Sequence, residues 1–556
     1  MAQSSGLCFG IQTERLFCFF ISEKIMRRFH SYGPVDEKRH FAVPRKDLVK
    51  SCVENLISDP EYGGHYFTIW APRQSGKTWL MQQAVREIQI LYGNQFAVHT
   101  CSLGRLRGMV YKSEDSDYPH LPLGFADVLE DELPGKPCLK TWKDFFRVFS
   151  KDGGLWDRPL ILFIDEVDTA PAFLLDLLVN QFREMYLKRE ANLLHGLALI
   201  GVRAVLGADS DRGSPFNIQR SLRVPNFTRG EVGNLFQQYQ SESGQTVDPE
   251  VVHQVFDFTR GQPGLVGWFG ELLTEKYNPG RENGIDLPHW KLVYHKACHS
   301  EWNNTILNLI KKMHLPYQNI VSQLFSRSDM LFSLDADWCA YLYLNGIITP
   351  ETVGDEHQQF REICRFSCPF IQRRLYNALT LELVGRRLPI LALEPTDRIT
   401  DLFAGAEPDL PGLMERYKAY LLRLKARGLN PWKDQPRRTD LHLSEAVGHF
   451  HLYAWLREAL DGICTVSPEF PTGNGKVDLH LLCADISGII EVKSFRSLVK
   501  TEEAKQQAAA YAKSLCLTQV MIALFVPVED EKILRELSGE TVIDGVKVIV
   551  AAIAWV

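Results

Sequence analysis

The segment Ala71–Thr78 combines small residues, a lysine and a threonine at a spacing suited to phosphate binding. It stands between an apolar run, Tyr66–Trp70, and a helical pattern. In such a strand–loop–helix arrangement, the backbone N–H groups of the loop and of the helix N-terminus point at phosphate oxygens. Gly76 lets the backbone approach, Lys77 reaches the β and γ oxygens, and Thr78 can hold Mg²⁺. We predict a site for ATP and Mg²⁺ formed by Ala71, Pro72, Arg73, Gln74, Ser75, Gly76, Lys77 and Thr78.

Another apolar run, Leu160–Ile164, ends in two acids, Asp165 and Glu166. After a buried strand, the first of two such acids binds magnesium through water, and the second polarises the water that attacks the γ-phosphate. Taken singly, the loop could be a glycine turn and the acids a helix cap. Their order and flanking strands favour a nucleotide site, with Glu166 catalytic and with Asp165 and Thr78 at the metal.

A second set of polar residues stands in the apolar frame of the C-terminal region. Asp478 lies in one predicted strand, and Glu491 and Lys493 lie two apart in the next, so the last two share a face. Two carboxylates can hold Mg²⁺ with open positions for water and phosphate, and a lysine can activate that water. Glu445, on a preceding helix, is a third candidate metal ligand. This pattern predicts phosphodiester hydrolysis.

The alternative for this region is a solvated hairpin with incidental charge alternation. The charge of Glu491 inside an apolar run argues against it, because burying an unused charge is costly. Gln507 and Tyr511 lie four apart on the following helix and are accessory candidates on one face. We interpret the nearby histidines as helix-surface residues, since Mg²⁺ prefers oxygen ligands. They are His442, His449 and His451.

The elements around the first motif predict the α/β fold class, with a parallel sheet over residues 66–280. The strand-like runs are Tyr66–Trp70, Phe96–Cys101, Leu160–Ile164 and Leu197–Val205. The helical patterns between them are Trp79–Leu91, Thr141–Phe149 and Ala172–Lys188. Residues 1–65 are predicted to be a lead-in, in which Met26 is a candidate native start and residues 1–25 are non-native.

Residues 281–393 are predicted to form a helical, winged-helix lid. Three helical patterns precede a short strand pair: Asn304–Met313, Ile320–Phe325, Ala336–Leu344, then Gly346–Pro350 with Ile363–Phe366. Residues 394–440 are predicted to be a Pro- and Asp-rich linker with a basic helix, Leu413–Arg427.

Residues 441–556 are predicted to form a second, smaller α/β domain. Its expected elements, in order, are the helix Leu443–Leu460, the strands Lys476–Cys483 and Ile486–Ser494, the helix Glu502–Leu515, and the strands Gln519–Val526 and Lys547–Trp555.

The bulk composition is that of an ordinary globular protein of several domains. The 556 residues are 45% hydrophobic and 23% charged, with a net charge of −6, so a nucleic-acid contact would need a local basic patch. No apolar run approaches the roughly 20 residues that span a bilayer, so no membrane partner is expected. The 12 cysteines show no pairing rhythm, which favours reduced thiols and a cytoplasmic location.

Residues 66–275 resemble the AAA-like ATPases of the STAND and archaeal type. The matching segments are Phe67–Thr78, Leu160–Asp168, Leu199–Arg203, Ser214–Ile218 and Gly261–Pro263. Ala71 replaces the usual first glycine of the phosphate loop, but it is still small. The resemblance implies that Arg203 senses the γ-phosphate, that Gly261 and Pro263 lie in a helical lid over the nucleotide, and that the chain can form homo-oligomers. Weak candidates for an arginine finger are Arg212 and Arg220.

Residues 440–528 resemble the PD-(D/E)xK nuclease superfamily. The matching residues are Glu445, Asp478, Glu491, Lys493, Gln507 and Tyr511. Val477 stands where that family often has a proline. The resemblance implies a restriction-endonuclease-like fold, with Asp478, Glu491 and Lys493 as the catalytic residues and the three acids as metal ligands.

These observations together predict an ATP-hydrolysing switch that controls a metal-dependent nuclease, in a setting such as defence against foreign DNA. The expected partner is nucleic acid, with DNA favoured over RNA. Residues 411–440 hold eight Lys and Arg against three acids, which suits a phosphate backbone but equally suits a solvated helix face. The alternative function is a regulatory ATPase of the STAND type whose nuclease-like domain only binds nucleic acid or a protein.

Overall fold

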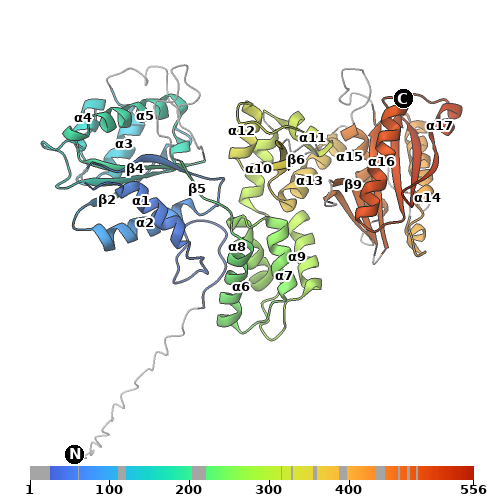
Figure 1. The fold of residues 1–556 in the computed structure, drawn as a ribbon, viewed down its shortest axis with the longest axis horizontal. Coiled ribbons are helices and arrows are strands. Elements are labelled where there is room, and N and C mark those ends of the chain that lie inside the picture. The colour runs from blue at the N-terminus through green and yellow to red at the C-terminus, as the bar shows by residue number, and fades with distance from the viewer. Residues whose placement is uncertain are drawn as a thin grey trace, which may run out of the picture.

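The computed structural model places an N-terminal α/β part, a helical middle and a C-terminal sheet along the long axis of the molecule (Figure 1). The described residues run from 26 to 555, with the exception of 61, 110–119, 203–220, 315, 327–329, 355–359, 387–392, 394–396, 398, 433–444, 461–463, 472–475 and 484–485.

The N-terminal sheet has five parallel strands in the order β2-β3-β4-β1-β5. Every residue of β3 and β4 is buried, because helices cover both faces of the sheet. Parallel strands bring the loops after β1 and β3 to one edge. The strands are β1 (Tyr66–Trp70), β2 (Ala97–Ser102), β3 (Leu160–Asp165), β4 (Leu194–Gly201) and β5 (Ser221–Arg223).

Two apolar clusters hold helices on the two faces of this sheet. On one face lie α1 (Lys46–Ile57) and α2 (Lys77–Tyr92). On the other face lie α3 (Leu123–Glu132), α4 (Trp142–Val148) and α5 (Ala172–Leu187), as Figure 1 shows. The predicted parallel α/β sheet is therefore present, and its first and third strands begin at the predicted residues.

A group of helices follows the sheet and is called the lid below; it begins earlier in the chain than the lid predicted at residues 281–393. Its first helix begins at a capping box in which Thr228 and Glu231 satisfy each other's backbone N–H groups. The lead-in segment belongs to this lid, because Phe29 packs on Phe236 and Arg27 pairs with Glu242 at 2.5 Å. The lid elements are α6 (Arg229–Ser243), α7 (Pro249–Thr259), α8 (Pro263–Glu271), the π-helical turn Leu272–Lys276 and α9 (Leu287–His299).

The next part has three helices, a two-stranded antiparallel hairpin and a long last helix. The three helices and the hairpin stand in the predicted order, although the hairpin strands extend further than the sequence indicated and the last helix was not predicted. The elements are α10 (Asn304–His314), α11 (Gln318–Ser326), α12 (Asp337–Leu344), β6 (Ile348–Gly354), β7 (Phe360–Phe366) and α13 (Pro369–Arg386).

The C-terminal sheet has six strands in the order β12-β13-β11-β10-β9-β8, with parallel and antiparallel pairs. The predicted strands β9 (Lys476–Cys483), β10 (Ile486–Ser494) and β11 (Gln519–Val526) have the expected bounds. The sequence interpretation missed the short helix α17 (Glu531–Leu537) and two strands. These strands are β8 (Thr465–Pro471), an edge strand with two prolines, and β12 (Gly539–Ile543); the remaining strand is β13 (Val546–Ala554).

Helices cover both faces of this second sheet. On one face α14 (Leu410–Ala426) and α15 (Glu445–Ala459) share an apolar cluster with β9, β10, β11 and β13. On the other face α16 (Leu498–Ser514) packs on β11 and β13. The helix α14, predicted as part of a linker region, therefore packs as a layer of the C-terminal domain.

Two cysteines depart from the expectation of reduced thiols. Cys464 and Cys483 form a disulfide, with Cα atoms 4.2 Å apart. The pairing of Thr465 with Leu482 in the β8–β9 ladder places these two cysteines opposite each other. Their separation of 19 residues matches no motif, so only the strand pairing reveals the contact. Within the described residues, no helix is long and apolar enough to cross a membrane.

Candidate functional site

The phosphate loop turns directly from β1 into α2. Gly76 is the N-cap of α2 and has φ of 88°, and Gln74 also has a positive φ of 58°. A Cβ at position 76 would meet no atom within 4 Å, so the left-handed backbone, not a lack of space, requires glycine there. The Ser75 hydroxyl donates to the Pro72 carbonyl at 2.8 Å and closes the loop.

The side chain of Lys77 folds back over this loop. Its Nζ donates to the carbonyls of Ala71 at 2.8 Å and Pro72 at 2.9 Å. Burial lowers the pKa of Lys77 to about 8, against the opposing charges of Asp168 and Asp165. A bound phosphate would offer this desolvated ammonium a full negative charge in place of neutral carbonyls, which favours anion binding.

Thr78 and Asp165 meet at the edge of the sheet. The Thr78 hydroxyl donates to Asp165 Oδ2 at 2.8 Å, and the Glu166 N–H donates to Asp165 Oδ1 at 2.7 Å. Burial raises the pKa of Asp165, while these two hydrogen bonds oppose that shift. A hydroxyl beside a carboxylate is the hard oxygen donor set that suits Mg²⁺. These two predicted metal residues are therefore together.

Glu166 is held in a conformation that few residues with side chains adopt. Its φ is 57°, in the left-handed region, directly after β3. Its carboxylate accepts from Ser102 Oγ and from Arg107, each at 3.2 Å. Sequence reasoning missed these two partners. The β2–β3 register, which pairs Ser102 with Asp165, was the signal that could have found the serine.

The lid contacts the phosphate loop through its Gly261–Pro263 turn. Gln262 caps α8 and donates from Nε2 to the Arg73 carbonyl at 3.1 Å, and the Gly264 N–H donates to the Gln74 carbonyl at 3.0 Å. Gly261, with φ of 69°, sits so close that a Cβ would meet the Phe227 carbonyl oxygen at 1.9 Å. The turn thus joins lid and loop, and Gln262 is a contact that the sequence did not reveal.

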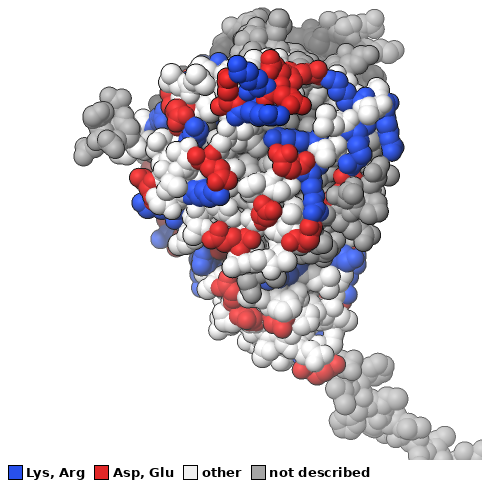
Figure 2. Space-filling view, turned by 90° about the vertical axis from the view of Figure 1, so that its right-hand side faces the viewer, with Lys and Arg blue, Asp and Glu red and all other residues white. Residues whose placement is uncertain are grey.

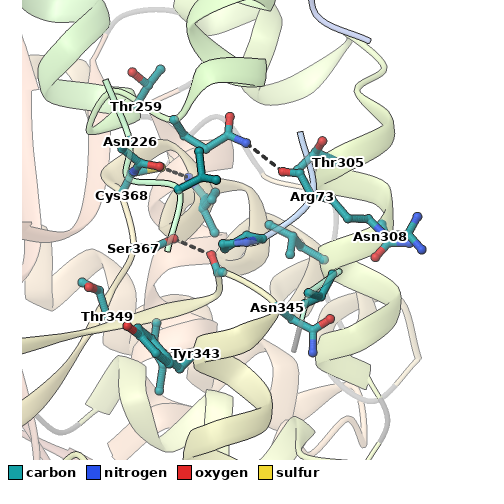
Figure 3. A pocket seen from close by; sticks show the side chains of 18 of the residues that line it. Arg73, Asn226, Thr259, Thr305, Asn308, Tyr343, Asn345, Thr349, Ser367 and Cys368 are labelled. Atoms are coloured by element: carbon teal, nitrogen blue, oxygen red, sulfur yellow. Dashed lines mark hydrogen bonds between the residues drawn. The ribbon is translucent and has the colours of Figure 1, made fainter. Parts of the chain in front are cut away.

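A pocket opens beside the phosphate loop, between the lid and the hairpin (Figure 3). The Thr305 hydroxyl of α10 donates to Gln74 Oε1. Gly346, before β6, lies against Pro72, where a Cβ would come within 2.8 Å. The loop therefore contacts the start of α8, α10 and the residue Gly346 before the hairpin. Polar side chains that line the pocket include Arg73, Asn226, Thr305, Asn308 and Asn345.

The proposed sensor Arg203 and the finger candidates Arg212 and Arg220 lie outside the described residues, as does the segment Ser214–Ile218. Of the residues before them, Val202 donates its N–H to the Asp168 carboxylate, which fixes the end of β4 against the turn after β3.

The second candidate site forms where β9 and β10 pair. The register of Ile490 with Leu479 brings Asp478 opposite Glu491 on one face of the sheet. Lys493 Nζ lies 3.0 Å from Glu491 Oε2 and 3.4 Å from Asp478 Oδ2. Asp478 Oδ2 also accepts from the Val492 N–H at 2.7 Å. The structure therefore brings the predicted acid–acid–lysine set together on adjacent strands.

Burial dominates the electrostatics of this cluster. Glu491 is 2% exposed, and burial together with the charge of Asp478 raises its pKa to about 7. Burial opposes the charged form of Lys493, yet the carboxylates of Asp478, Glu491 and Glu445 raise the pKa of Lys493 well above its usual value. The lysine thus stays charged and neutralises acids that would otherwise repel each other.

The other predicted members surround this cluster at greater distance. Glu445 begins α15, lies 3.8 Å from Arg496, and has its pKa raised by burial. Among the described residues, no group of three His, Cys, Asp or Glu side chains is arranged to hold a metal ion, so the role of Glu445 as a third metal ligand stays a prediction. Gln507 Nε2 donates to the Tyr511 hydroxyl at 2.6 Å, as expected for residues on one face of α16.

The interpretation of the histidines as helix-surface residues is wrong for the two that are described. His449 and His451 are 3% and 1% exposed, because α15 is enclosed by the sheet on one side and by α11, α13 and α14 on others. His449 Nε2 lies 2.9 Å from the Asp478 carbonyl oxygen, and His451 Nδ1 lies 2.7 Å from the Tyr417 hydroxyl. His442 lies outside the described residues.

The basic helix offers less free charge than its sequence indicated. Four of its cations form ion pairs: Arg416 with Asp401, Lys418 with Glu415, Arg423 with Asp397 and Lys425 with Glu529. On the face that carries the C-terminal domain, Figure 2 shows acidic and basic side chains interspersed. The cations Lys433, Arg437 and Arg438 lie outside the described residues. The described part of this region is therefore a mixed surface.

No protein-family model matches the sequence, and no curated protein matches it. Among solved structures, a Walker-type ATPase of Pyrococcus abyssi matches over 62% of this chain and 99% of its own, at 14% identity and a TM-score of 0.39. The Orc1 protein of Aeropyrum pernix, in complex with DNA, matches over 61% of this chain and 93% of its own, at 11% identity and a TM-score of 0.32. A RuvB variant of Thermotoga maritima matches over 57% of this chain and 91% of its own, at 14% identity and a TM-score of 0.32.

These TM-scores and identities are too low to carry an argument about activity.

Proposed function

We propose that this chain is an ATP-hydrolysing switch that controls a metal-dependent phosphodiesterase acting on DNA. For the switch, the main supporting observation is the contact of Thr78 with Asp165 at 2.8 Å, next to the partly buried Lys77 at the end of a loop with a left-handed glycine. A hydroxyl, a carboxylate and an ammonium are then in place for the magnesium and phosphates of one nucleotide.

In this proposal each residue of the nucleotide site has a separate task. Lys77 turns from its loop carbonyls to the β and γ oxygens, and Thr78 with Asp165 would hold Mg²⁺, which supplies charge neutralisation when bound. Glu166, aimed by Ser102 and Arg107, orients the attacking water and accepts its proton at a carboxylate oxygen. The lid contacts at Gln74 would then respond to the loaded loop.

For the phosphodiesterase, the carrying observation is the convergence of Asp478, Glu491 and Lys493 from two paired strands. Their two carboxylates offer hard oxygen ligands, and the ion they would hold supplies Lewis-acid activation of water and phosphate. The Lys493 ammonium would shift from the acids to the attacked phosphate or its water. The exposed Gln507 and the adjacent Tyr511 lie on α16 beside this cluster and would contact the substrate backbone.

The test is a cleavage assay of the full-length chain on plasmid DNA, single-stranded DNA and RNA with Mg²⁺. Wild type should cleave DNA, and Asp478→Ala and Glu491→Ala should not. Activity of these variants equal to wild type would exclude the assignment. Retained cleavage by a variant of an exposed acid in the same domain, Glu536→Ala, serves as the matched control.

A second candidate function is favoured by one observation. Lys493 lies between the two acids and neutralises them, and the described residues supply no third carboxylate in coordinating distance. The C-terminal domain would then only bind nucleic acid or a protein partner. In that case no nucleic acid is cut by wild type, while Lys77→Ala still abolishes ATP binding.

A further inference from the structure

The helix α13 lies between the lid and the C-terminal domain and bonds to both. Arg374 donates to the carbonyls of Ala297 and, at 3.0 Å, Glu301, at the end of α9. Its neighbour Arg373 donates to the Val466 carbonyl of β8 at 2.7 Å. Adjacent residues of one helix therefore connect the lid with the C-terminal domain.

A third residue of α13 repeats this double contact. Asn377 donates to the Cys298 carbonyl of α9 at 3.3 Å and accepts from the Tyr453 hydroxyl of α15 at 3.2 Å. The Arg373 guanidinium also stands over the Tyr453 ring, 5.5 Å from its centroid. Polar contacts in such number are costly to break away from water, so α13 is coupled to both neighbours.

The contact that reaches the candidate phosphodiesterase site runs through Tyr376. This buried side chain places its hydroxyl 3.4 Å from His449 Nδ1, with the rings edge to face and 5.4 Å apart. His449 Nε2 lies 2.9 Å from the carbonyl oxygen of Asp478. Because a carbonyl only accepts, the His449 proton is on Nε2, and Nδ1 is left to accept from the Tyr376 hydroxyl.

The backbone of Asp478 has a particular need for this support. The β9–β10 ladder ends at the pair Leu479 with Ile490, one residue before Asp478. Beyond that pair, the imidazole holds the Asp478 carbonyl, and the Asp478 carboxylate caps the Val492 N–H at 2.7 Å. The position of this candidate metal ligand is thus set partly from α15 and α13. Groups that orient a metal ligand in this way strongly affect metal affinity.

We propose that His449 is a positioning residue for Asp478, and that Tyr376 transmits the nucleotide state of the lid to it. The proposal rests on the proposed function. A contiguous route exists from the phosphate loop: Thr305 of α10 donates to Gln74, α10 packs on α13, and α13 carries Tyr376. A shift of the lid on nucleotide exchange therefore moves the Tyr376 hydroxyl relative to His449.

The experiment measures the DNA cleavage rate of the full-length chain with ATP and with ADP, at several Mg²⁺ concentrations. Tyr376→Phe keeps the ring and removes the hydroxyl. His449→Gln keeps an N–H donor at the Nε2 position and removes the Nδ1 acceptor. Both should retain ATP hydrolysis and basal cleavage but bring the ATP-to-ADP rate ratio close to one. His449→Leu removes both contacts and should raise the Mg²⁺ requirement about tenfold or more.

The matched control is Tyr417→Phe. The Tyr417 hydroxyl makes the same kind of contact, to Nδ1 of His451, which lies on α15 as His449 does. Among the hydrogen bonds of the described residues, none joins Tyr417 or His451 to Asp478. Tyr417→Phe should keep the wild-type ratio. A wild-type ATP-to-ADP rate ratio in both Tyr376→Phe and His449→Gln would overturn the proposal. An equal loss of that ratio in Tyr417→Phe would also overturn it. If His449→Leu does not fold, the other two variants decide. Absence of any wild-type cleavage would instead remove the proposed function, and the inference with it.

Discussion

The nucleotide site takes its polar groups from loops at the open edge of a parallel sheet, whereas the C-terminal site takes them from inside two paired strands. The phosphate loop that carries Lys77 is contacted by the lid residue Gln262 at Arg73 and by Gly346, just before the hairpin, at Pro72. Glu491 and Asp478 instead face each other across a ladder, with Lys493 neutralising them. The first site can sense a change of domain packing directly, while the second responds only when its strands or their supports move.

The largest effect that separates the two sites is expected from Asp478→Asn. The substitution keeps the size of the side chain and removes the charge that would bind the metal and pair with Lys493. DNA cleavage should fall by about 10³-fold, and ATP hydrolysis should stay at the wild-type rate. The exposed N-cap variant Asp530→Asn is the control in gel-based cleavage assays. Equal loss of ATP hydrolysis would break the separation of the sites.

The reverse experiment is Glu166→Gln. ATP binding should persist, because Lys77, Thr78 and Asp165 are untouched, but hydrolysis should slow by about 10²-fold when the proton acceptor is lost. Phosphate release measures the rate, and the exposed Glu190→Gln is the control. An unchanged rate would mean that another group activates the water. With ATP present, the Glu166→Gln protein should cleave DNA at the constant rate of the ATP-bound state, because the bound ATP is hardly hydrolysed.

The pH dependence of metal binding should distinguish the buried acid pair from an ordinary surface pair. The pKa of Glu491 is raised to about 7 from 4.5, so the folded chain holds this proton to higher pH than the unfolded chain does. Divalent metal displaces that proton, so the metal affinity should rise about tenfold per pH unit below pH 6 and level off above pH 7. Calorimetry with Mn²⁺ measures this. A flat profile in wild type would contradict the buried, proton-holding state of Glu491.

The same raised pKa has a consequence for stability without metal. Since the unfolded chain releases the proton near pH 4.5 and the folded chain near pH 7, the free energy of unfolding should fall as pH rises through this window. Glu491→Gln cannot ionise and should flatten that slope. Thermal denaturation of wild type and variant at matched pH values checks the sign.

The smallest effect concerns the phosphate loop. Gly76→Ala meets no atom, but it places a Cβ on a backbone with φ of 88°, which costs about 1–2 kcal/mol. Because the free loop can relax this strain and nucleotide binding restores it, the ATP affinity should fall by roughly tenfold, with little loss of overall stability. Gly233→Ala, on the surface of α6 with open space and a helical backbone, is the control. An unchanged affinity would show that the loop tolerates the strain or rearranges.

The same contrast explains what could be predicted from sequence. The phosphate loop and the acidic strand are local patterns, so their residues and bounds follow from neighbours in the chain. The strands that carry Asp478 and Glu491 were equally clear as apolar runs. The register that places Asp478 opposite Glu491 could only be expected, because the short connection between the two strands is the one local feature that limits how they pair.

What could not be predicted depends on packing between distant segments. The support of Glu166 by Ser102 and Arg107, the Gln262 contact with the loop, and the burial of His449 all need the folded positions of other elements. The edge strand β8 was hidden by its two prolines, and the disulfide it permits was hidden with it. The helix α15 is enclosed on several sides and so lacks a clear polar face, and the assignment of its histidines to the surface relied on such a face.

The most direct test of the account is the DNA cleavage rate of wild type and Lys77→Ala, each measured with and without ATP under the same Mg²⁺. The account predicts that ATP changes the wild-type rate, while Lys77→Ala cleaves at the nucleotide-free rate under both conditions. Identical responses to ATP in the two proteins would contradict the claim that the phosphate loop controls the C-terminal site.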